Sequence, residues 1–329
     1  MKQTVYLFSN GELKRKDNTL FFETEKGRNY IPVENTKELY IFGEVTINKR
    51  VIEFLTENHI ILHFFNYYEY YVGSFYPREH LNSGYILLKQ VENYIDNNKR
   101  ITIAKLIFQG AIQNIIKNLK YYNNREKLLN EVLKEISELL KKSENIDSIS
   151  QLMGIEGNIR EKYYNSFNTI LQNDNFLFES RTKRPPKNKL NALISFGNSI
   201  LYTTVLSEIY KTHLDPRIGY LHESNFRRFT LNLDIAEIFK PIIIDKIIFS
   251  LINKMMIKEE HFETILNGIT LNEEGAKIFL REFEEKMKTS IKHHKMNRNV
   301  SYRELIRMEL YKLQKHLIGE EEYKPYIHT

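Results

Sequence analysis

The chain has 329 residues, of which 48 are Lys or Arg and 42 are Asp or Glu, so its formal net charge at pH 7 is +6. This length is ample for one large domain or two domains with real cores, and the modest positive excess permits an anionic partner without establishing nucleic-acid binding. Cysteine is absent, which excludes disulfides and thiolate metal sites, so any metal must be held by oxygen and imidazole ligands.

Hydropathy gives no reason to expect a membrane protein. The most apolar stretch, Ile242–Ile252, is interrupted by Asp245 and Lys246 and is typical of a buried helix. The N-terminus enters a strand-like pattern directly and does not have the design of a signal peptide. We therefore expect a cytoplasmic protein without membrane contact.

Residues 1–80 have the pattern of short strands separated by turn signals such as Ser9-Asn10-Gly11-Glu12. Because local turns join neighbouring strands, this part predicts a small, twisted β domain. The expected strands are Thr4–Ser9, Glu12–Lys16, Thr19–Thr24, Arg28–Val33, Leu39–Phe42, Ile60–Phe65 and Tyr68–Phe75, with a short helix over Asn48–Glu57.

Residues 81–329 have apolar side chains at helical spacing almost throughout. The pattern therefore predicts an α+β chain in which the small N-terminal β domain is followed by a larger all-α domain. The expected helices are Ile86–Tyr94, Arg100–Tyr122, Glu126–Lys142, Asn158–Leu171, Leu190–Lys211, Ile242–Met256, Glu273–Lys292 and Tyr302–Ile318, with a further helix capped by Asn232.

The stretch Gly219–Pro241 combines an imidazole with two carboxylates. His222 lies in a polar loop, and Asp234 and Glu237 follow at a spacing that places both on one face of a helix. Two interpretations stay open for these residues alone. They are either an ordinary solvated face with a loop histidine, which is the more frequent case, or part of a metal site.

Two further features carry charge in unusual settings. Glu156 lies between Gly154 and Gly157, and the glycines predict a short turn that places this carboxylate at a helix entrance. A loop with Pro185-Pro186 at its centre is rich in cations, which the stiff prolines should keep from collapsing onto the surface. Such a loop suits phosphate contact or is a solubilising surface feature. Its cations include Arg181, Lys183, Arg184 and Lys187, and Arg227 and Arg228 stand just before the Asn232 helix.

Three separated motifs, in this order, resemble the CRISPR-associated integrases of spacer acquisition, the "Cas-one" family. They are GIEG-x-x-R-x-x-YY around Glu156, R-x-K-R-P-P-K-N-x-x-N-A-L-I-S-F-G from Arg181 to Gly197, and G-Y-L-H-E with L-x-L-D-I-A-E-I-F-K-P from Gly219 to Pro241. The resemblance extends over essentially the whole chain. It implies an N-terminal β domain (residues 1–80) used for dimerisation and a helical catalytic domain (residues 81–329).

The resemblance also implies a metal site made by Glu156, His222 and Glu237. Some branches of the family have an Asp ten residues after the histidine, where this chain has Asn232. The third ligand is therefore assigned to Glu237, and Asp234 either supports the ligands or replaces one of them. Two carboxylates and one imidazole suit Mg²⁺ or Mn²⁺.

The implied activity is a metal-dependent DNA endonuclease and integrase that inserts spacers into a CRISPR array by 3′-OH transesterification. Lys183, Arg184, Arg227 and Arg228 would hold the DNA backbone, together with Arg181 and Lys187 of the basic loop. The implied partners are DNA, a second copy of the chain and the small ferredoxin-like "Cas-two" protein. The alternatives are a stand-alone metal-dependent nuclease on branched DNA and a non-catalytic DNA-binding scaffold.

Overall fold

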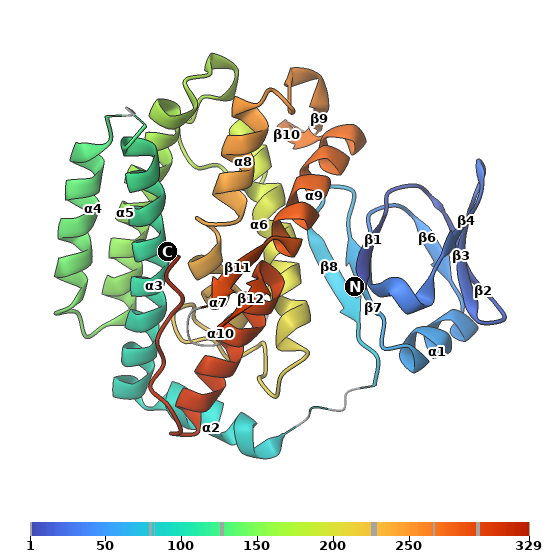
Figure 1. The fold of residues 1–329 in the computed structure, drawn as a ribbon, viewed down its shortest axis with the longest axis horizontal. Coiled ribbons are helices and arrows are strands. Elements are labelled where there is room, and N and C mark those ends of the chain that lie inside the picture. Colours follow the sequence, from blue (N-terminus) through green and yellow to red (C-terminus); the bar gives the residue numbers. More distant parts are fainter. Residues whose placement is uncertain are drawn as a thin grey trace. The chain divides into compact units, whose positions relative to one another are not determined.

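The computed structural model forms two compact units, residues 1–82 and 83–329 (Figure 1). Strands make up most of the first unit and helices most of the second, so the predicted order of a β part followed by a mostly helical part is confirmed. The structure describes residues 2–78, 81, 83–125, 128–224, 229–265, 267–293 and 297–328.

The first unit contains two four-stranded sheets, with the strand orders β1-β5-β7-β8 and β4-β3-β2-β6. The meander of β2, β3 and β4 uses short local turns, as the sequence predicts. The pairs β1–β5 and β5–β7 are instead parallel and join strands that are distant in sequence, which local turn signals do not reveal. The strands are β1 (Gln3–Leu7), β2 (Gly11–Lys16), β3 (Thr19–Thr24), β4 (Gly27–Ile31), β5 (Thr36–Ile41), β6 (Val45–Ile47), β7 (Ile61–Phe65) and β8 (Tyr71–Phe75).

One apolar core joins the two sheets and the helix α1 (Lys49–Glu57). Leu13 comes from one sheet, Leu39 from the other and Leu55 from the helix, and all three are fully buried. Alternate residues of a strand point to the same face, so pairs such as Leu39 and Ile41 of β5 both enter the core. The helix begins where the sequence predicts, because the Asn48 side chain accepts a hydrogen bond from the backbone N–H of Val51 at 3.1 Å.

The second unit packs its helices around α6 and α7, whose side chains are almost all buried. Asn114 of α3 donates a hydrogen bond to the Ile238 carbonyl at 2.9 Å and so holds α3 to the end of α7. The helices are α2 (Gly84–Ile95), α3 (Asn97–Asn123), α4 (Asn130–Ser143), α5 (Ile149–Leu171), α6 (Lys189–Ile209), α7 (Leu231–Phe239), α8 (Ile244–Asn253), α9 (Glu273–Lys288) and α10 (Tyr302–Leu317).

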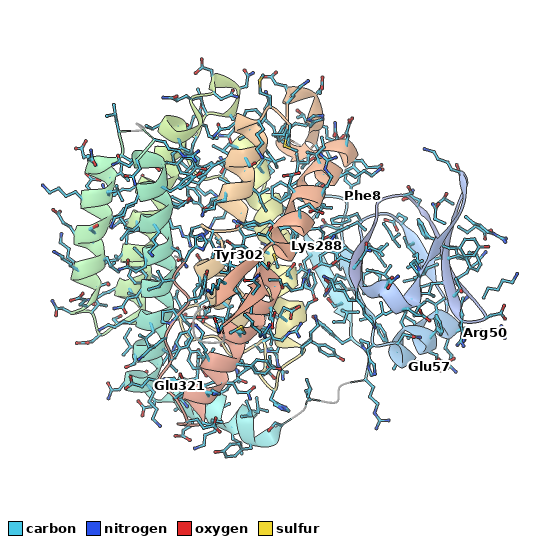
Figure 2. All side chains as sticks on the ribbon, viewed as in Figure 1. Phe8, Arg50, Glu57, Lys288, Tyr302 and Glu321 are labelled. Carbon is cyan, nitrogen blue, oxygen red and sulfur yellow. The ribbon has the colours of Figure 1, made fainter. Side chains whose placement is uncertain are left out.

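Two short hairpins interrupt this helical unit, so the prediction of an entirely helical second part was too simple. They are formed by β9 (Phe262–Ile265) with β10 (Gly268–Leu271), and by β11 (Ser290–His293) with β12 (Arg298–Ser301). The helix expected to reach Lys292 therefore ends at Lys288. Tyr302, labelled in Figure 2, follows the second hairpin at the first position of α10 and is 2% exposed.

The turn predicted at Gly154–Gly157 is wrong, because α5 runs unbroken from Ile149 to Leu171. A Cβ added at either glycine would meet no atom within 4 Å, so neither glycine is required by close packing. A glycine inside a helix costs about 1 kcal/mol relative to alanine. The packing of the buried face of this long helix offsets that cost. Glu156 therefore lies in the middle of a helix, with Arg160 one turn later on the same face.

The predicted cap of α7 is also wrong. Thr230 occupies the N-cap position, and Asn232 lies inside the helix, 6% exposed, with its side-chain amide donating to the Tyr202 carbonyl at 3.3 Å. The helix ends at Phe239, two residues before Pro241, so the proline stands in the turn between α7 and α8. Proline has no N–H to donate to a helix and is well tolerated there.

Candidate metal centre

Asp234 is the most enclosed carboxylate of the candidate site. It is fully buried and accepts hydrogen bonds from three consecutive backbone N–H groups of the loop before α7. Tyr220 and Leu221 donate to Oδ2 at 2.5 and 3.0 Å, and His222 donates to Oδ1 at 2.9 Å. A buried carboxylate with this many donors fixes the course of the loop.

The same carboxylate sets the chemistry of His222. The Nδ1 atom of His222 lies 2.8 Å from Oδ1 of Asp234. Because an ionised carboxylate only accepts hydrogen bonds, Nδ1 must carry the proton. In the neutral ring the lone pair is therefore on Nε2, the arrangement found in metal-binding histidines that are supported by a carboxylate.

Gly219 makes the close approach of loop and helix possible. A Cβ at this position would lie 2.7 Å from the Thr230 backbone and 2.9 Å from Oδ2 of Asp234. These separations are shorter than van der Waals contact, so a larger residue would push the loop away from Asp234. The glycine in the sequence GYLHE thus has a direct steric explanation.

Arg160 brings together the two carboxylates that the sequence analysis assigned as ligands. Its Nε donates to Oε1 of Glu156 at 2.7 Å, and its Nη2 forms a very short ion pair with Oε2 of Glu237. Glu156 lies on α5 and Glu237 on α7, so the guanidinium bridges two helices that are far apart in sequence. The side chains of Arg160 and Glu237 are 11% and 6% exposed, which makes the bridge a nearly buried one.

A second cation, Lys240, lies beside the carboxylate of Glu237. Its Nζ contacts Oε1 of Glu237 at 2.5 Å and lies 4.7 Å from the ring centre of Tyr202 on α6. Burial raises the pKa of Glu156, but Arg160, Lys240 and His222 together outweigh burial, so the pKa of this carboxyl is lowered. Glu156 is therefore ionised at neutral pH, and His222 is near enough to contribute to the lowering of its pKa.

The site does not form a ready-made cation cage. Among the residues that the structure describes, no three His, Asp or Glu side chains gather closely enough to hold a metal ion. Glu156 and Glu237 instead meet through the guanidinium of Arg160. The donor types nevertheless fit Mg²⁺ or Mn²⁺, because these ions bind carboxylate oxygens and tolerate an imidazole nitrogen, and His222 is near enough to Glu156 to act on its pKa.

The basic loop between α5 and α6 is less free than predicted. Arg181 turns inward and donates from Nη1 to the Asn191 side chain at 2.8 Å and from Nη2 to Ser195 at 3.0 Å. Lys187 donates to the Asn267 carbonyl at 2.8 Å. The expectation that the prolines keep all the cations off the surface is therefore wrong for these two.

Lys183 and Arg184 are exposed, as is Lys187. Burial of part of the Lys183 side chain, with the nearby charges of Arg181 and Lys240, lowers the pKa of Lys183. Lys183 is thus within electrostatic reach of Lys240 and Glu156. Arg227 and Arg228 lie outside the described residues.

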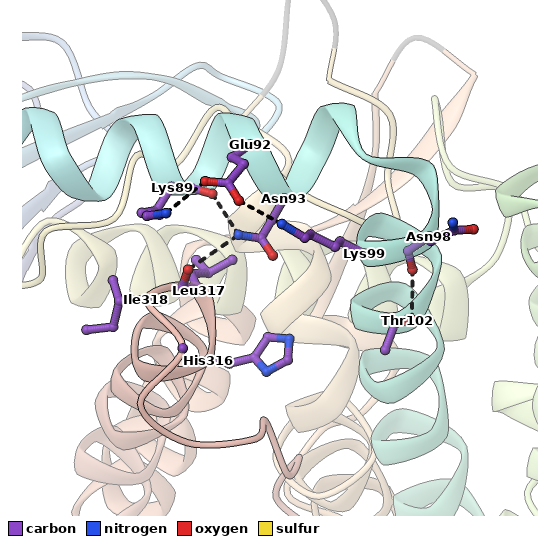
Figure 3. Close-up of a pocket in the computed structure, with 10 residues that line it drawn as sticks. Lys89, Glu92, Asn93, Asn98, Lys99, Thr102, His316, Leu317 and Ile318 are labelled. Atoms are coloured by element: carbon purple, nitrogen blue, oxygen red, sulfur yellow. Dashed lines mark hydrogen bonds and ion pairs between the residues drawn. The ribbon is translucent and has the colours of Figure 1, made fainter.

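A pocket of 490 Å³ lies elsewhere in the second unit, between α2, the start of α3 and the end of α10 (Figure 3). Glu92 binds Lys89 at 2.8 Å and Lys99 at 2.7 Å at its edge. None of the candidate ligands lines this pocket, so it is not part of the site described above. Its lining consists of Lys89, Glu92, Asn93, Asn98, Lys99, Thr102, His316, Leu317, Ile318 and Gly319.

Comparison with known proteins identifies the family. The family model described as "CRISPR associated protein Cas1" matches residues 5–285. The CRISPR-associated endonuclease Cas1 2 of Thermodesulfovibrio yellowstonii is 62% identical over 327 residues, with 99% of each chain covered. The CRISPR-associated endonuclease Cas1 of Thermotoga maritima is 53% identical over 321 residues, with 98% of each chain covered. The chain belongs to the Cas1 family.

Solved structures agree with this assignment of a Cas1 fold. A Cas1 protein from Thermotoga maritima has a TM-score of 0.88 at 52% identity, over 98% of this chain and 99% of that one. A casposase bound to an integration product has a TM-score of 0.90 at 19% identity, over 100% and 95% of the two chains, which speaks for the fold alone. The resemblance inferred from the three motifs is therefore confirmed.

The Cas1 motifs contained signals that the sequence analysis did not use. Arg160 is the arginine of GIEG-x-x-R, four residues after Glu156, and Lys240 stands three residues after Glu237. Both spacings place opposite charges on one helix face. What the spacing could not reveal is that Arg160 also reaches Glu237 on another helix. Among the described helices, none is long and apolar enough to cross a membrane.

Proposed function

We propose that this Cas1 family member is a metal-dependent DNA endonuclease and integrase that inserts short DNA spacers into a CRISPR array by 3′-OH transesterification. Two relatives, at 62% and 53% identity, are named CRISPR-associated endonucleases. The observation that carries the proposal is the meeting of Glu156 and Glu237 at one guanidinium, with the Asp234-supported His222 within electrostatic reach.

The proposed ligands of the ion are Glu156, His222 and Glu237, and Asp234 holds His222 rather than binding the ion itself. A bound Mg²⁺ or Mn²⁺ ion would supply a Lewis acid for the scissile phosphate and the attacking oxygen. In the Asp234–His222 pair, Asp234 accepts a hydrogen bond from Nδ1–H of His222. This bond keeps the proton on Nδ1 and leaves the lone pair of Nε2 available. Arg160 neutralises the two carboxylates in the metal-free protein, where two adjacent buried negative charges would otherwise repel each other.

The basic loop supports a DNA-binding role next to these residues. Lys183 and Arg184 are proposed to contact phosphate groups, since both are exposed and Lys183 is close to Lys240 and Glu156. Arg181 and Lys187 would act by shaping the loop, because both are bonded within the protein. Arg227 and Arg228 are proposed as phosphate contacts on sequence grounds.

A solved structure of similar fold suggests a protein partner. One structure of similar fold, at 19% identity, is a Cas6-RT-Cas1–Cas2 complex, and we propose that this chain also assembles with a Cas2-type protein. We further propose that the first unit, residues 1–82, mediates a homodimer. Light scattering of the full chain and of the chain with residues 1–82 removed measures whether the dimer depends on this unit. Circular dichroism must first show that the shortened chain is folded.

The deciding experiment supplies a short DNA with free 3′-OH ends, a supercoiled acceptor plasmid and Mn²⁺. Joined products are expected from the full chain with a Cas2-type partner and are lost in Glu156→Ala and His222→Ala. Glu161→Ala, a matched change of an exposed glutamate on α5, keeps activity. Cleavage of branched DNA without any joined product would favour the stand-alone nuclease. Unchanged activities in Glu156→Ala and His222→Ala would favour the non-catalytic scaffold.

A further inference from the structure

A second group of cations lies on elements that the proposed metal centre does not use. It comprises Lys117 of α3, Lys246 of α8, Lys286 of α9 and His328 near the C-terminus, and we call it the lysine cluster. Lys286 Nζ lies 4.4 Å from the ring centre of Tyr302 and 3.4 Å from its hydroxyl. The ring centres of Tyr302 and His328 are 6.3 Å apart, so α9, the start of α10 and the C-terminal segment meet here.

The C-terminal segment is fixed in place at this cluster. The backbone N–H of His328 donates to Asn114 Oδ1 at 2.8 Å, and Asn114 Nδ2 donates to the Tyr326 carbonyl at 3.0 Å. Tyr326 packs parallel to Phe239 with ring centres 5.9 Å apart, and its hydroxyl lies 3.2 Å from Nδ1 of His328. The imidazole is therefore held by its neighbours rather than by solvent, and its Nε2 is left as a hydrogen-bonding atom.

The charges of the cluster repel one another. Among the residues that the structure describes, no carboxylate forms an ion pair with Lys117, Lys246 or Lys286. Burial, with the charge of Lys246, lowers the pKa of Lys286 to about 8. Burial and the charges of Lys246, Lys286 and Lys117 lower the pKa of His328 to about 4. Lys246 and Lys286 are partly buried, whereas Lys117 is exposed. Partly buried like charges without a counter-ion cost free energy, and a bound anion would reduce this cost.

We propose that the lysine cluster is a binding site for a phosphate group, the backbone phosphate of a DNA strand in the first place. The ammonium groups supply charge and three donors each, and the neutral His328 supplies a further hydrogen bond. The tyrosines at its edge, Tyr302 and Tyr121, give aromatic surface beside the cations, with Lys246 Nζ 5.8 Å from the Tyr121 ring. The assignment of DNA as the ligand rests on the proposed function. The assignment of a phosphate site does not depend on the proposed function.

The test measures binding of a labelled DNA duplex between about 50 and 200 mM salt by the wild type and by the double variant Lys246→Gln/Lys286→Gln. Each lysine that contacts phosphate contributes about 0.9 to the slope of log affinity against log salt, so the slope should fall by about 1.8. Affinity at one salt concentration should fall about tenfold per lysine. The control is Lys288→Gln on the same helix, which pairs with Glu285 at 3.9 Å and is labelled in Figure 2.

A second arm titrates inorganic phosphate and follows the ring protons of His328 by NMR, with His328→Ala to assign them. A changed salt slope supports DNA as the source of the phosphate. An unchanged slope with a phosphate-dependent shift of His328 supports a free phosphate compound. No change in either arm overturns the proposal. If the Gln variants fold poorly, Lys246→Arg/Lys286→Arg keeps the charges and should keep the slope.

This experiment is separable from the test of the proposed function. Glu156→Gln should lose DNA joining while retaining the wild-type salt slope, because Glu156 does not belong to the lysine cluster. A wild-type chain without joining activity would count against the proposed function alone. A slope that the double variant leaves unaltered, together with no response to phosphate, would count against this inference alone.

Discussion

Arg160 offers the sharpest prediction, because its removal should act in opposite directions on folding and on metal binding. In Arg160→Gln the guanidinium that neutralises Glu156 and Glu237 is lost. Breaking a buried charge network by removing one partner costs about 3–5 kcal/mol. For a chain of this size each kcal/mol corresponds to roughly 2–4 °C, so Tm in a chelator should fall by about 6–20 °C.

The same change should favour a divalent ion. The ion and Arg160 compete for the same two carboxylates, so Mn²⁺ should bind Arg160→Gln more tightly than it binds the wild type. A ligand at about 100 times its Kd stabilises the folded state by about 2.7 kcal/mol, so saturating Mn²⁺ should restore a large part of the lost stability. Isothermal titration calorimetry measures the affinity, and thermal unfolding with chelator or Mn²⁺ measures the rescue.

Arg303→Gln is the matched control. Arg303 is a second buried arginine of the same unit, 5% exposed, and its ion pairs are made with Glu208 and Glu284, away from the candidate ligands. Its loss should lower Tm equally with and without Mn²⁺. If Arg160→Gln behaves in the same way, or binds Mn²⁺ more weakly than the wild type, Arg160 has a purely structural role and the reasoning fails.

Three more predictions follow from the same packing and charges. Asp234→Asn should weaken Mn²⁺ binding about 10–100-fold in calorimetry, because Asp234 accepts hydrogen bonds at both oxygens, whereas asparagine has one accepting oxygen, one NH2 donor and no negative charge; unchanged affinity would disprove this support. Lys211, Arg303 and Arg307 outweigh the effect of burial and lower the pKa of the buried Glu208 to about 2. Since its unfolded value is higher, this carboxyl stabilises the fold above about pH 4.5 and loses that contribution, about 3 kcal/mol, as pH falls toward 2. Urea unfolding of Glu208→Gln should therefore show the loss already at pH 7 and a flatter acid profile. Gly197→Ala should cost about 1–3 kcal/mol, because its Cβ would lie 2.7 Å from Ile244, whereas Gly154→Ala, with open space around it, should gain about 0.5–1 kcal/mol; equal effects would contradict the packing argument.

The sequence alone determined much of this protein. The alternation of apolar residues predicted the strand-rich first part, and the helical period predicted most helices of the second, because these patterns record which side chains are withdrawn from water. The three motifs were sufficient for the family. They also pointed to Glu156, His222 and Glu237, because the type and order of the residues in a motif can be read without knowing the fold.

Only the tertiary structure decided how these residues are used. The helix through Gly154 and Gly157 is continuous because α5 is held by its neighbours, although glycine favours a turn locally. Asp234 supports His222 because the loop of Gly219 folds back onto α7. The bridge from Glu156 through Arg160 to Glu237 joins two helices whose separation along the chain carries no information about distance. Such contacts depend on packing between remote segments, and local pattern does not encode them.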